Sequence, residues 1–181
     1  MTLAKLPFTM RICGLDELAD ELSEFAPSYV VSILDPGEDD GEPLVFPASV
    51  SVLRLRFFDF HSLGGVVGKA LARQGRDENP CIDHAEAIIH FGRSIPVGAK
   101  VLCHCWAGIS RSTAAAFLLA RLHLPEADAM ELVMALRPGA IPNRLLLKFG
   151  EKILGVDGRT VPAPGDQRRG VSSRSIRSSN R

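Results

Sequence analysis

The sequence contains no long run of apolar residues. None of its 181 residues lies in a stretch that approaches the roughly 18 uninterrupted apolar residues of a membrane-spanning helix. The N-terminal segment also meets charged residues before it could form the apolar part of a secretory signal. We therefore expect a cytoplasmic protein with no membrane segment. Because 46% of the residues are hydrophobic, the chain can still bury a sizeable core, and its length favours one domain.

Cysteine is scarce, and its spacing excludes two common classes of protein. The four cysteines are too widely spaced for a secreted disulfide framework, and no second Cys/His pair completes a zinc pattern. The acidic turn at residues 35–42 could suggest a metal site, but it reads as a solvated turn. We expect free thiols and no metal or organic cofactor. The thiols are Cys13, Cys81, Cys103 and Cys105.

The chain has no excess charge of either sign, with 21 basic and 21 acidic residues. The balance hides an asymmetry, because residues 155–181 carry six arginines and two aspartates. This segment is rich in Gly, Pro, Ser and Arg and has few large apolar residues, which predicts a disordered basic tail. Residues 1–154 form the predicted domain. A solvated extension explains the tail without a nucleic-acid or lipid partner, and we expect neither.

Periodicity predicts an α/β fold. Short segments rich in β-branched or other apolar residues, bounded by turn signals, predict strands at residues 9–14, 29–35, 51–57 and 100–105. Apolar residues at helical spacing predict helices at residues 15–25, 79–95, 110–123, 125–136 and 142–154. Asn79 and Pro80 look like the N-cap and first position of the second helix. The alternation favours a mainly parallel sheet of about four to five strands flanked by helices.

The segment CHCWAGISRST, residues 103–113, is the most informative part of the sequence. A strand ends near Cys105, a short loop follows, and a helix begins near Arg111, so the N–H groups of the loop can converge on an anion. These groups and the nearby cations favour the thiolate of Cys105, a nucleophile. Arg111 can offer its planar fork to two phosphate oxygens, Gly108 permits close approach, and Ser112 can donate to the sulfur.

Residues 104–112 resemble the His-Cys-x5-Arg-Ser/Thr signature of the protein tyrosine phosphatase superfamily, in the form typical of its small dual-specificity branch. The segments YVVSILD, SVLRLRFFD and RPGAIPN extend this resemblance over roughly residues 10–154. The resemblance implies the α/β sandwich of that family and hydrolysis of phosphomonoesters through a phosphocysteine. It implies a catalytic Cys105 and Arg111 and a substrate-binding loop of His104, Trp106, Ala107, Gly108, Ile109, Ser110 and Ser112.

Hydrolysis that leaves an alkoxide or phenoxide also needs a proton donor. Asp59 follows the third predicted strand, where the resemblance places the general acid of the family. Asp83, in the first turn of a helix, and Asp77, in a polar loop, are the alternatives. Asn143 lies in a segment that resembles the Pro-Asn element bracing the catalytic loop. It could equally be a neighbour of the N-cap of the last helix, and the sequence leaves this open.

Phosphorylated proteins are the substrate class that the resemblance favours, with small phosphomonoesters as a further possibility. A module that captures phosphorylated partners without turnover is one alternative function. An arsenate reductase or sulfur transferase with the same loop is another. Residues 61–79 are longer than a compact member would need and form either a helical lid or a rigid packed helix. Cys103, two positions before Cys105 on a strand, is expected to pack in the core.

Overall fold

The computed structural model of the chain describes residues 5–37, 44–60 and 79–155. The predicted basic tail beyond Gly155 lies outside this range, as do residues 61–78 of the predicted lid and the alternative acid Asp77. Within the described residues, no helix is both long enough and apolar enough to cross a membrane.

A four-stranded parallel sheet forms the centre of the fold, which confirms the predicted fold class. The strand order is β1-β4-β2-β3, so β4 lies between β1 and β2. Because all four strands are parallel, their carboxyl ends meet at one edge of the sheet. The strands are β1 Thr9–Cys13, β2 Tyr29–Leu34, β3 Ser51–Arg56 and β4 Lys100–His104.

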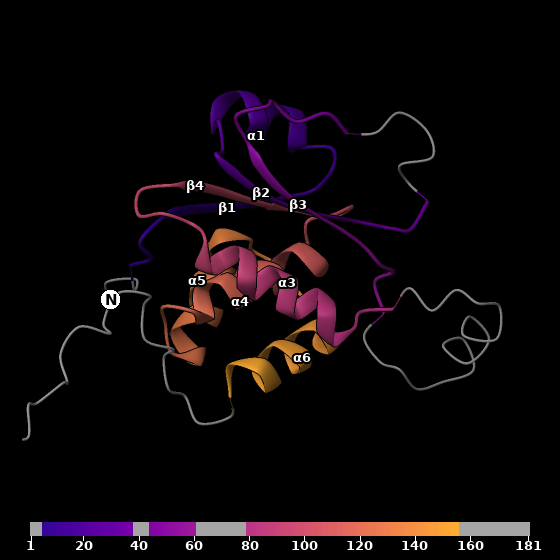
Figure 1. Cartoon of the computed structure of the whole chain (residues 1–181), viewed down its shortest axis with the longest axis vertical. Helices are drawn as coiled ribbons and strands as arrows, with labels where there is room; N and C mark the ends of the chain where they lie inside the picture. Colours follow the sequence, from indigo (N-terminus) through magenta and orange to yellow (C-terminus); the bar gives the residue numbers. More distant parts are fainter. Residues whose placement is uncertain (1–4, 38–43, 61–78, 156–181) are drawn as a thin grey trace, which may run out of the picture.

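Helices cover both faces of the sheet unequally. Among the described residues, one short helix, α1 Leu18–Glu24, packs on one face, and four helices pack on the other (Figure 1). Of these four, α4 directly follows the loop at residues 105–110 and contacts α3, α5 and α6. The four are α3 Ile82–Arg93, α4 Arg111–Arg121, α5 Glu126–Leu136 and α6 Arg144–Leu154.

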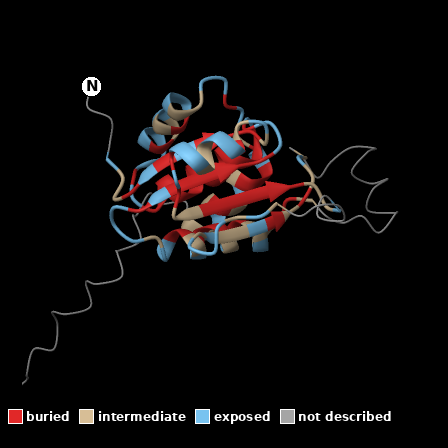
Figure 2. Cartoon of the chain, turned by 90° about the horizontal axis from the view of Figure 1, so that it is seen from above, coloured by how far each residue is buried: buried red, intermediate tan, exposed pale blue. Residues whose placement is uncertain are grey.

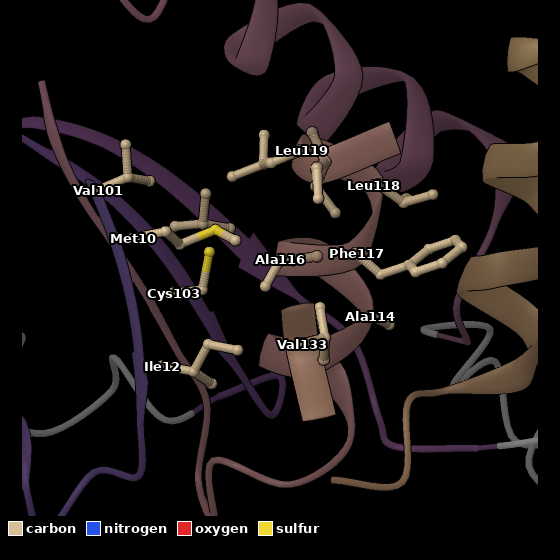
Figure 3. Packing of buried hydrophobic residues seen from close by; sticks show 14 of the residues in the cluster. Met10, Ile12, Val101, Cys103, Ala114, Ala116, Phe117, Leu118, Leu119 and Val133 are labelled. Atoms are coloured by element: carbon tan, nitrogen blue, oxygen red, sulfur yellow. The ribbon is translucent and has the colours of Figure 1, made fainter. Parts of the chain in front are cut away.

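The core follows from the alternation of side chains along the strands. In β4, Val101 and Cys103 face the larger layer of helices, whereas Leu102 joins the smaller cluster beneath α1. Every residue of α4 is buried, so this helix fills the centre of the larger layer. Figure 2 shows buried strands at the centre of the molecule as well. Figure 3 shows its Ala116 and Leu119 close to Met10, Val101 and Cys103 of the sheet. The helix that follows the loop is therefore held rigidly by packing.

Two helices, α1 and α3, begin three residues later than the sequence predicts. The helix α1 begins at Leu18, and Leu15, whose N–H donates to the Trp106 carbonyl (2.8 Å), belongs to the connection after β1. The prediction of an N-cap at Asn79 was wrong, since Cys81 is the N-cap of α3. The Cys81 N–H donates to Nδ1 of His84 (3.2 Å), three residues further along the chain, so the N–H group of the N-cap has a partner.

Candidate active site

The loop between β4 and α4, residues 105–110, is held by hydrogen bonds that pull its carbonyl oxygens outwards. The Trp106 carbonyl accepts from the Leu15 N–H (2.8 Å), and the Ile109 carbonyl accepts from the Ile141 N–H (2.9 Å). The Ser110 carbonyl accepts from the Asn143 N–H (3.2 Å). Because a peptide unit is planar and trans, a carbonyl oxygen that points outwards turns the N–H of the following residue inwards.

The N–H groups of the loop are left available for a ligand. Among the described residues, no hydrogen bond has the N–H of Trp106, Ala107, Gly108 or Ile109 as its donor. Unpaired N–H groups that converge ahead of a helix N-terminus form an anion-binding nest, which the helix dipole strengthens. The arrangement can hold the oxygens of a small tetrahedral anion.

Gly108 is the residue that allows this loop to close against β1. Its φ is +70°, a region that side chains rarely adopt. A Cβ atom at this position would lie 2.5 Å from the carbonyl carbon of Cys13 and 2.5 Å from the nitrogen of Gly14. Glycine is therefore required for two independent reasons, the backbone angle and the contact with the end of β1.

The thiol of Cys105 lies at the base of this loop and is only 2% exposed. Its Sγ is 3.1 Å from Oγ of Ser112, in the first turn of α4. A thiolate can only accept, so the Ser112 hydroxyl would be the donor to it. The structure thus brings together the sulfur and the hydroxyl that the sequence placed seven residues apart.

His104 is fully buried, and its imidazole is neutral at physiological pH. Burial lowers its pKa to about 4, and a contact with the Cys105 backbone offsets only part of this effect. Arg56 and Arg54 lower the pKa further through their charge. Neither ring nitrogen makes a hydrogen bond of normal geometry with the described residues. His104 therefore cannot stabilise a thiolate through its charge, and its contribution to the loop is packing.

Arg111 is buried with one edge of its guanidinium occupied and the other open. The side chain is 4% exposed, and Nη1 donates to Oδ1 of Asp35 (2.5 Å) and to the Phe57 carbonyl (2.8 Å). Among the described residues, neither Nε nor Nη2 donates a hydrogen bond, and Nε is buried. Nε and Nη2 form the side-on edge, which suits two oxygens of a phosphate or carboxylate.

Asp59 lies beside the loop, at the carboxyl end of β3. Its Oδ1 accepts from Oγ of Ser110 (2.6 Å) and from Nδ2 of Asn143 (2.8 Å). Nδ2 of Asn143 also donates to the Phe60 carbonyl (2.9 Å). A carboxyl group at the entrance of an anion nest is placed where it can exchange a proton with a bound substrate.

Both contacts considered for Asn143 occur together. Its Oδ1 accepts from the N–H groups of Leu145 (3.1 Å) and Leu146 (3.0 Å), so Asn143 is itself the N-cap of α6. Its Nδ2 holds Asp59, and its N–H holds the Ser110 carbonyl. The buried side chain of Asn143 therefore connects the start of α6 with the candidate acid, and its backbone N–H connects both to the loop.

Sequence reasoning missed two residues that hold the site. Asp35 was assigned to a solvated turn, yet it pairs with Arg111. Arg137, after α5, pairs with Glu17 (2.8 Å) and donates to the Ala107 carbonyl (3.4 Å). The signal available for Asp35 was its position directly after a buried strand, at the edge where the ends of parallel strands meet.

The other cysteines near the loop are buried thiols, and the alternative acid Asp83 makes no hydrogen bond with the loop among the described residues. Cys103 is fully buried in the core as expected, and burial raises its pKa. Burial, followed by the charges of Glu21 and Glu17, raises the pKa of Cys13 to about 12. Asp83 is in the first turn of α3, and no hydrogen bond between described residues links it to the loop. The described ranges contain no cluster of three or more His, Cys, Asp or Glu that could hold a metal.

Comparisons with known proteins define the class of fold. No protein-family model matches the chain, and no curated protein matches it either. The crystal structure of DUSP15 is similar over 83% of this chain and 86% of that chain, with a TM-score of 0.52 and 23% identity. The crystal structure of PTPMT1 is similar over 80% of this chain and 91% of that chain (TM-score 0.51, 18% identity).

The phosphatase domain of Yvh1 from Chaetomium thermophilum is similar over 88% of this chain and 96% of that chain, with a TM-score of 0.52 and 16% identity. At these identities the likeness establishes the fold. The chain therefore has the fold of the small dual-specificity and tyrosine phosphatases, as the resemblance of residues 104–112 implied.

The ion pair of Arg111 and Asp35 generates a first prediction. We expect Asp35→Asn to weaken the binding of inorganic phosphate about 3- to 10-fold in titration calorimetry, because a neutral amide oxygen holds the guanidinium less firmly than a carboxylate does. The variant also removes a negative charge, but the Asp35 side chain is 41% exposed, so water and salt screen that effect. Asp20→Asn, an exposed carboxylate on α1, is the matched control. Unchanged or tighter binding by Asp35→Asn would contradict the positioning role.

The buried His104 predicts a particular pH dependence of stability. The pKa of His104 in the folded chain, about 4, lies below the ordinary value of 6.5. Between these two pH values, the unfolded chain therefore binds a proton at this residue and the folded chain does not. The free energy of unfolding should therefore fall by roughly 2 kcal/mol as pH falls from about 6.5 to about 4.5. Replacing His104 with Asn should remove this component in urea titrations. His90→Asn, at an exposed position, should leave it unchanged, and equal pH slopes for all three proteins would refute the assignment.

Proposed function

We propose that the chain is a cysteine-dependent phosphomonoester hydrolase that acts through a phosphocysteine intermediate. One observation carries the proposal. The buried guanidinium of Arg111 is fixed through Nη1, while its Nε–Nη2 edge has no partner among the described residues. A buried cation with an unused donor pair is costly unless a ligand completes it. A phosphate dianion in the nest, within reach of the thiol, provides the two acceptors.

In the first step, Sγ of Cys105 forms a bond to phosphorus as the bond from phosphorus to the leaving oxygen breaks. Asp59 transfers its proton to that oxygen, so that an alcohol or phenol departs instead of an anion. The loop N–H groups and the open edge of Arg111 hold the three equatorial oxygens, where charge accumulates during phosphoryl transfer. Positioning and charge stabilisation supply the catalysis, and no metal is required by this chemistry.

In the second step, water attacks the phosphocysteine. The water oxygen bonds to phosphorus, the bond from phosphorus to sulfur breaks, and Asp59 takes the proton that the water loses. The departing thiolate accepts the hydrogen bond of Ser112, whose Oγ lies 3.1 Å from Sγ. Ser110 and Asn143, which both donate to Oδ1 of Asp59, hold this carboxyl group beside the loop. The same group can thus serve as acid and then as base.

The surroundings of the loop support a phosphorylated protein side chain, phosphotyrosine above all, as the substrate. The side chains of the loop interior, residues 106–110, carry no charge. Trp106, Ile109 and Ile141 expose 56%, 40% and 62% of their surface, and the Ile141 N–H bonds the Ile109 carbonyl at the loop. An apolar rim suits an aromatic ring better than a polyanion. One PTPMT1 structure holds PI(5)P, and the uncharged loop of the present chain argues against such a ligand here.

The nucleophile is tested by Cys105→Ser. We expect this variant to lose turnover of an aryl phosphate by at least about 10³-fold, because an alcohol near its free pKa is a poor nucleophile. Phosphate binding should persist, since the nest and Arg111 remain. Acid quench of the parent during turnover should trap a phosphorylated Cys105, detectable by mass spectrometry. A parent that binds phosphate yet shows neither turnover nor trapped phosphocysteine would be a binding module, contrary to the proposal.

The acid is tested by Asp59→Asn, which keeps an oxygen that can accept from Ser110 and Asn143 but removes the proton. We expect the first step to slow by roughly 10²–10⁴ for phosphate esters with basic leaving groups and much less for activated ones. Single-turnover rates over a series of aryl phosphates measure this. Asp83→Asn is the matched control, at the exposed runner-up position. Equal dependence on leaving-group pKa in Asp59→Asn and the parent would remove Asp59 from the mechanism.

A further inference from the structure

A pocket of about 620 Å³ lies against the outer side of the candidate catalytic loop. Three segments form it: the connection between β1 and α1, the first residues of the loop, and the residue after α5. Their contacts with one another are direct, since the Leu15 N–H donates to the Trp106 carbonyl and Arg137 donates to the Ala107 carbonyl. The lining residues are Leu15, Asp16, Glu17, Trp106, Ala107 and Arg137.

The pocket and the anion nest share a wall. The carbonyl oxygens of Trp106 and Ala107 bond to residues that line the pocket. The N–H groups of the same two peptide units, which belong to Ala107 and Gly108, therefore point the opposite way, towards the nest. The thickness of one backbone therefore separates them. An extended peptide advances at most about 3.6 Å per residue, so a side chain one or two residues from a bound phosphoresidue can reach the pocket.

Of the two carboxylates that line the pocket, Glu17 is paired with a cation among the described residues and Asp16 is not. Glu17 accepts from Nη1 of Arg137 (2.8 Å) and from the Gly14 N–H (2.7 Å), so these two ionised groups neutralise each other. The same contacts, with Arg137 first, lower the pKa of Glu17. Asp16 makes no hydrogen bond or ion pair with the described residues, although Arg137 lies within reach of its charge. The pocket is therefore left with one exposed carboxylate.

That carboxylate lies next to the loop. A Cβ atom on Gly14 would be 2.6 Å from Oδ1 of Asp16 and 3.3 Å from the carbonyl carbon of Ala107, so both flank the same backbone position. The indole of Trp106 is 56% exposed and lines the same pocket. An exposed indole face is the aromatic surface that binds cations best. A planar cation can stack on the ring and present its edge to the carboxylate.

We propose that this pocket binds an arginine side chain of the phosphorylated protein substrate, located within two residues of the phosphorylated residue. The guanidinium would stack on Trp106 and pair with Asp16. The proposal rests on the phosphatase function proposed above, because the nest must hold the phosphate for the pocket to recognise what lies beside it. Asp16 and Trp106 then determine specificity, whereas Cys105, Arg111 and Asp59 perform the reaction.

The test uses phosphotyrosyl peptides of otherwise neutral sequence in which a single Arg, Gln or Glu is placed at each position from −2 to +2. At one or more positions we expect kcat/KM to be about 5- to 20-fold higher for Arg than for Gln, and lower still for Glu. Asp16→Asn should remove most of this preference, and Asp16→Lys should make Glu the preferred residue. Asp16→Asn should hydrolyse a small aryl phosphate at the parent's rate. Asp20→Asn, outside the pocket, should retain the Arg preference.

The outcomes separate this proposal from the function on which it rests. If the parent hydrolyses the aryl phosphate and all peptides alike, the pocket proposal fails and the phosphatase function stands. If the parent hydrolyses none of them, the proposed function fails. The affinities of the Cys105→Ser chain for the Arg and Gln phosphopeptides, measured by calorimetry, then test the pocket proposal by itself. Equal affinity for the Arg and Gln phosphopeptides, or an Arg preference that survives in Asp16→Asn and Asp16→Lys, would overturn it.

Discussion

The site depends on hydrogen bonds that turn the carbonyl groups of the loop at residues 105–110 away from the anion nest. Without the donors from Leu15, Ile141 and Asn143, nothing would prevent the peptide units of residues 106–110 from rotating, and their N–H groups would not converge. These donors come from the connection between β1 and α1 and from the connection before α6. Tertiary contacts thus impose a backbone shape that the loop could not hold alone, since a short loop left free gains conformational entropy. Gly108 is the one position where this shape demands a particular residue type.

The buried guanidinium of Arg111 imposes the second constraint. A cation that is 4% exposed has lost most of its hydration, and one ion pair with a half-exposed carboxylate restores only part of it. The Phe57 carbonyl supplies a second acceptor to the same nitrogen, which leaves the opposite edge without compensation. The cost is tolerated because α4 is buried along its whole length and cannot turn the side chain into solvent. Packing therefore holds Arg111 ready for an anion.

The parts of the molecule that could be predicted from sequence are those whose signals are local. The four strands and the loop were found because alternation, turn residues and the spacing from Cys105 to Arg111 all lie within short windows. The pair of Arg111 with Asp35 joins residues 76 positions apart, and that of Arg137 with Glu17 spans 120 positions. No local pattern marks such pairs. The position of Asp35 directly after β2 places it at the functional edge of the sheet, but nothing local indicates that Arg111 is its partner.

The parallel sheet explains why residues so distant in sequence meet at one place. All four carboxyl ends lie at one edge, and β4, which carries the loop, lies between β1 and β2. The end of β1 supplies the surface against which Gly108 closes, that of β2 supplies Asp35, and that of β3 supplies the Phe57 carbonyl and Asp59. Burial divides these groups by task. Gly108 and Phe57, which shape the nest and hold Arg111, are buried and Asp35 is half-exposed, whereas Asp59 and Trp106, which would meet the substrate, are exposed. Substitutions of the exposed side chains can therefore change substrate recognition without changing the chemistry at the nest, because the two functions use different faces of the same loop.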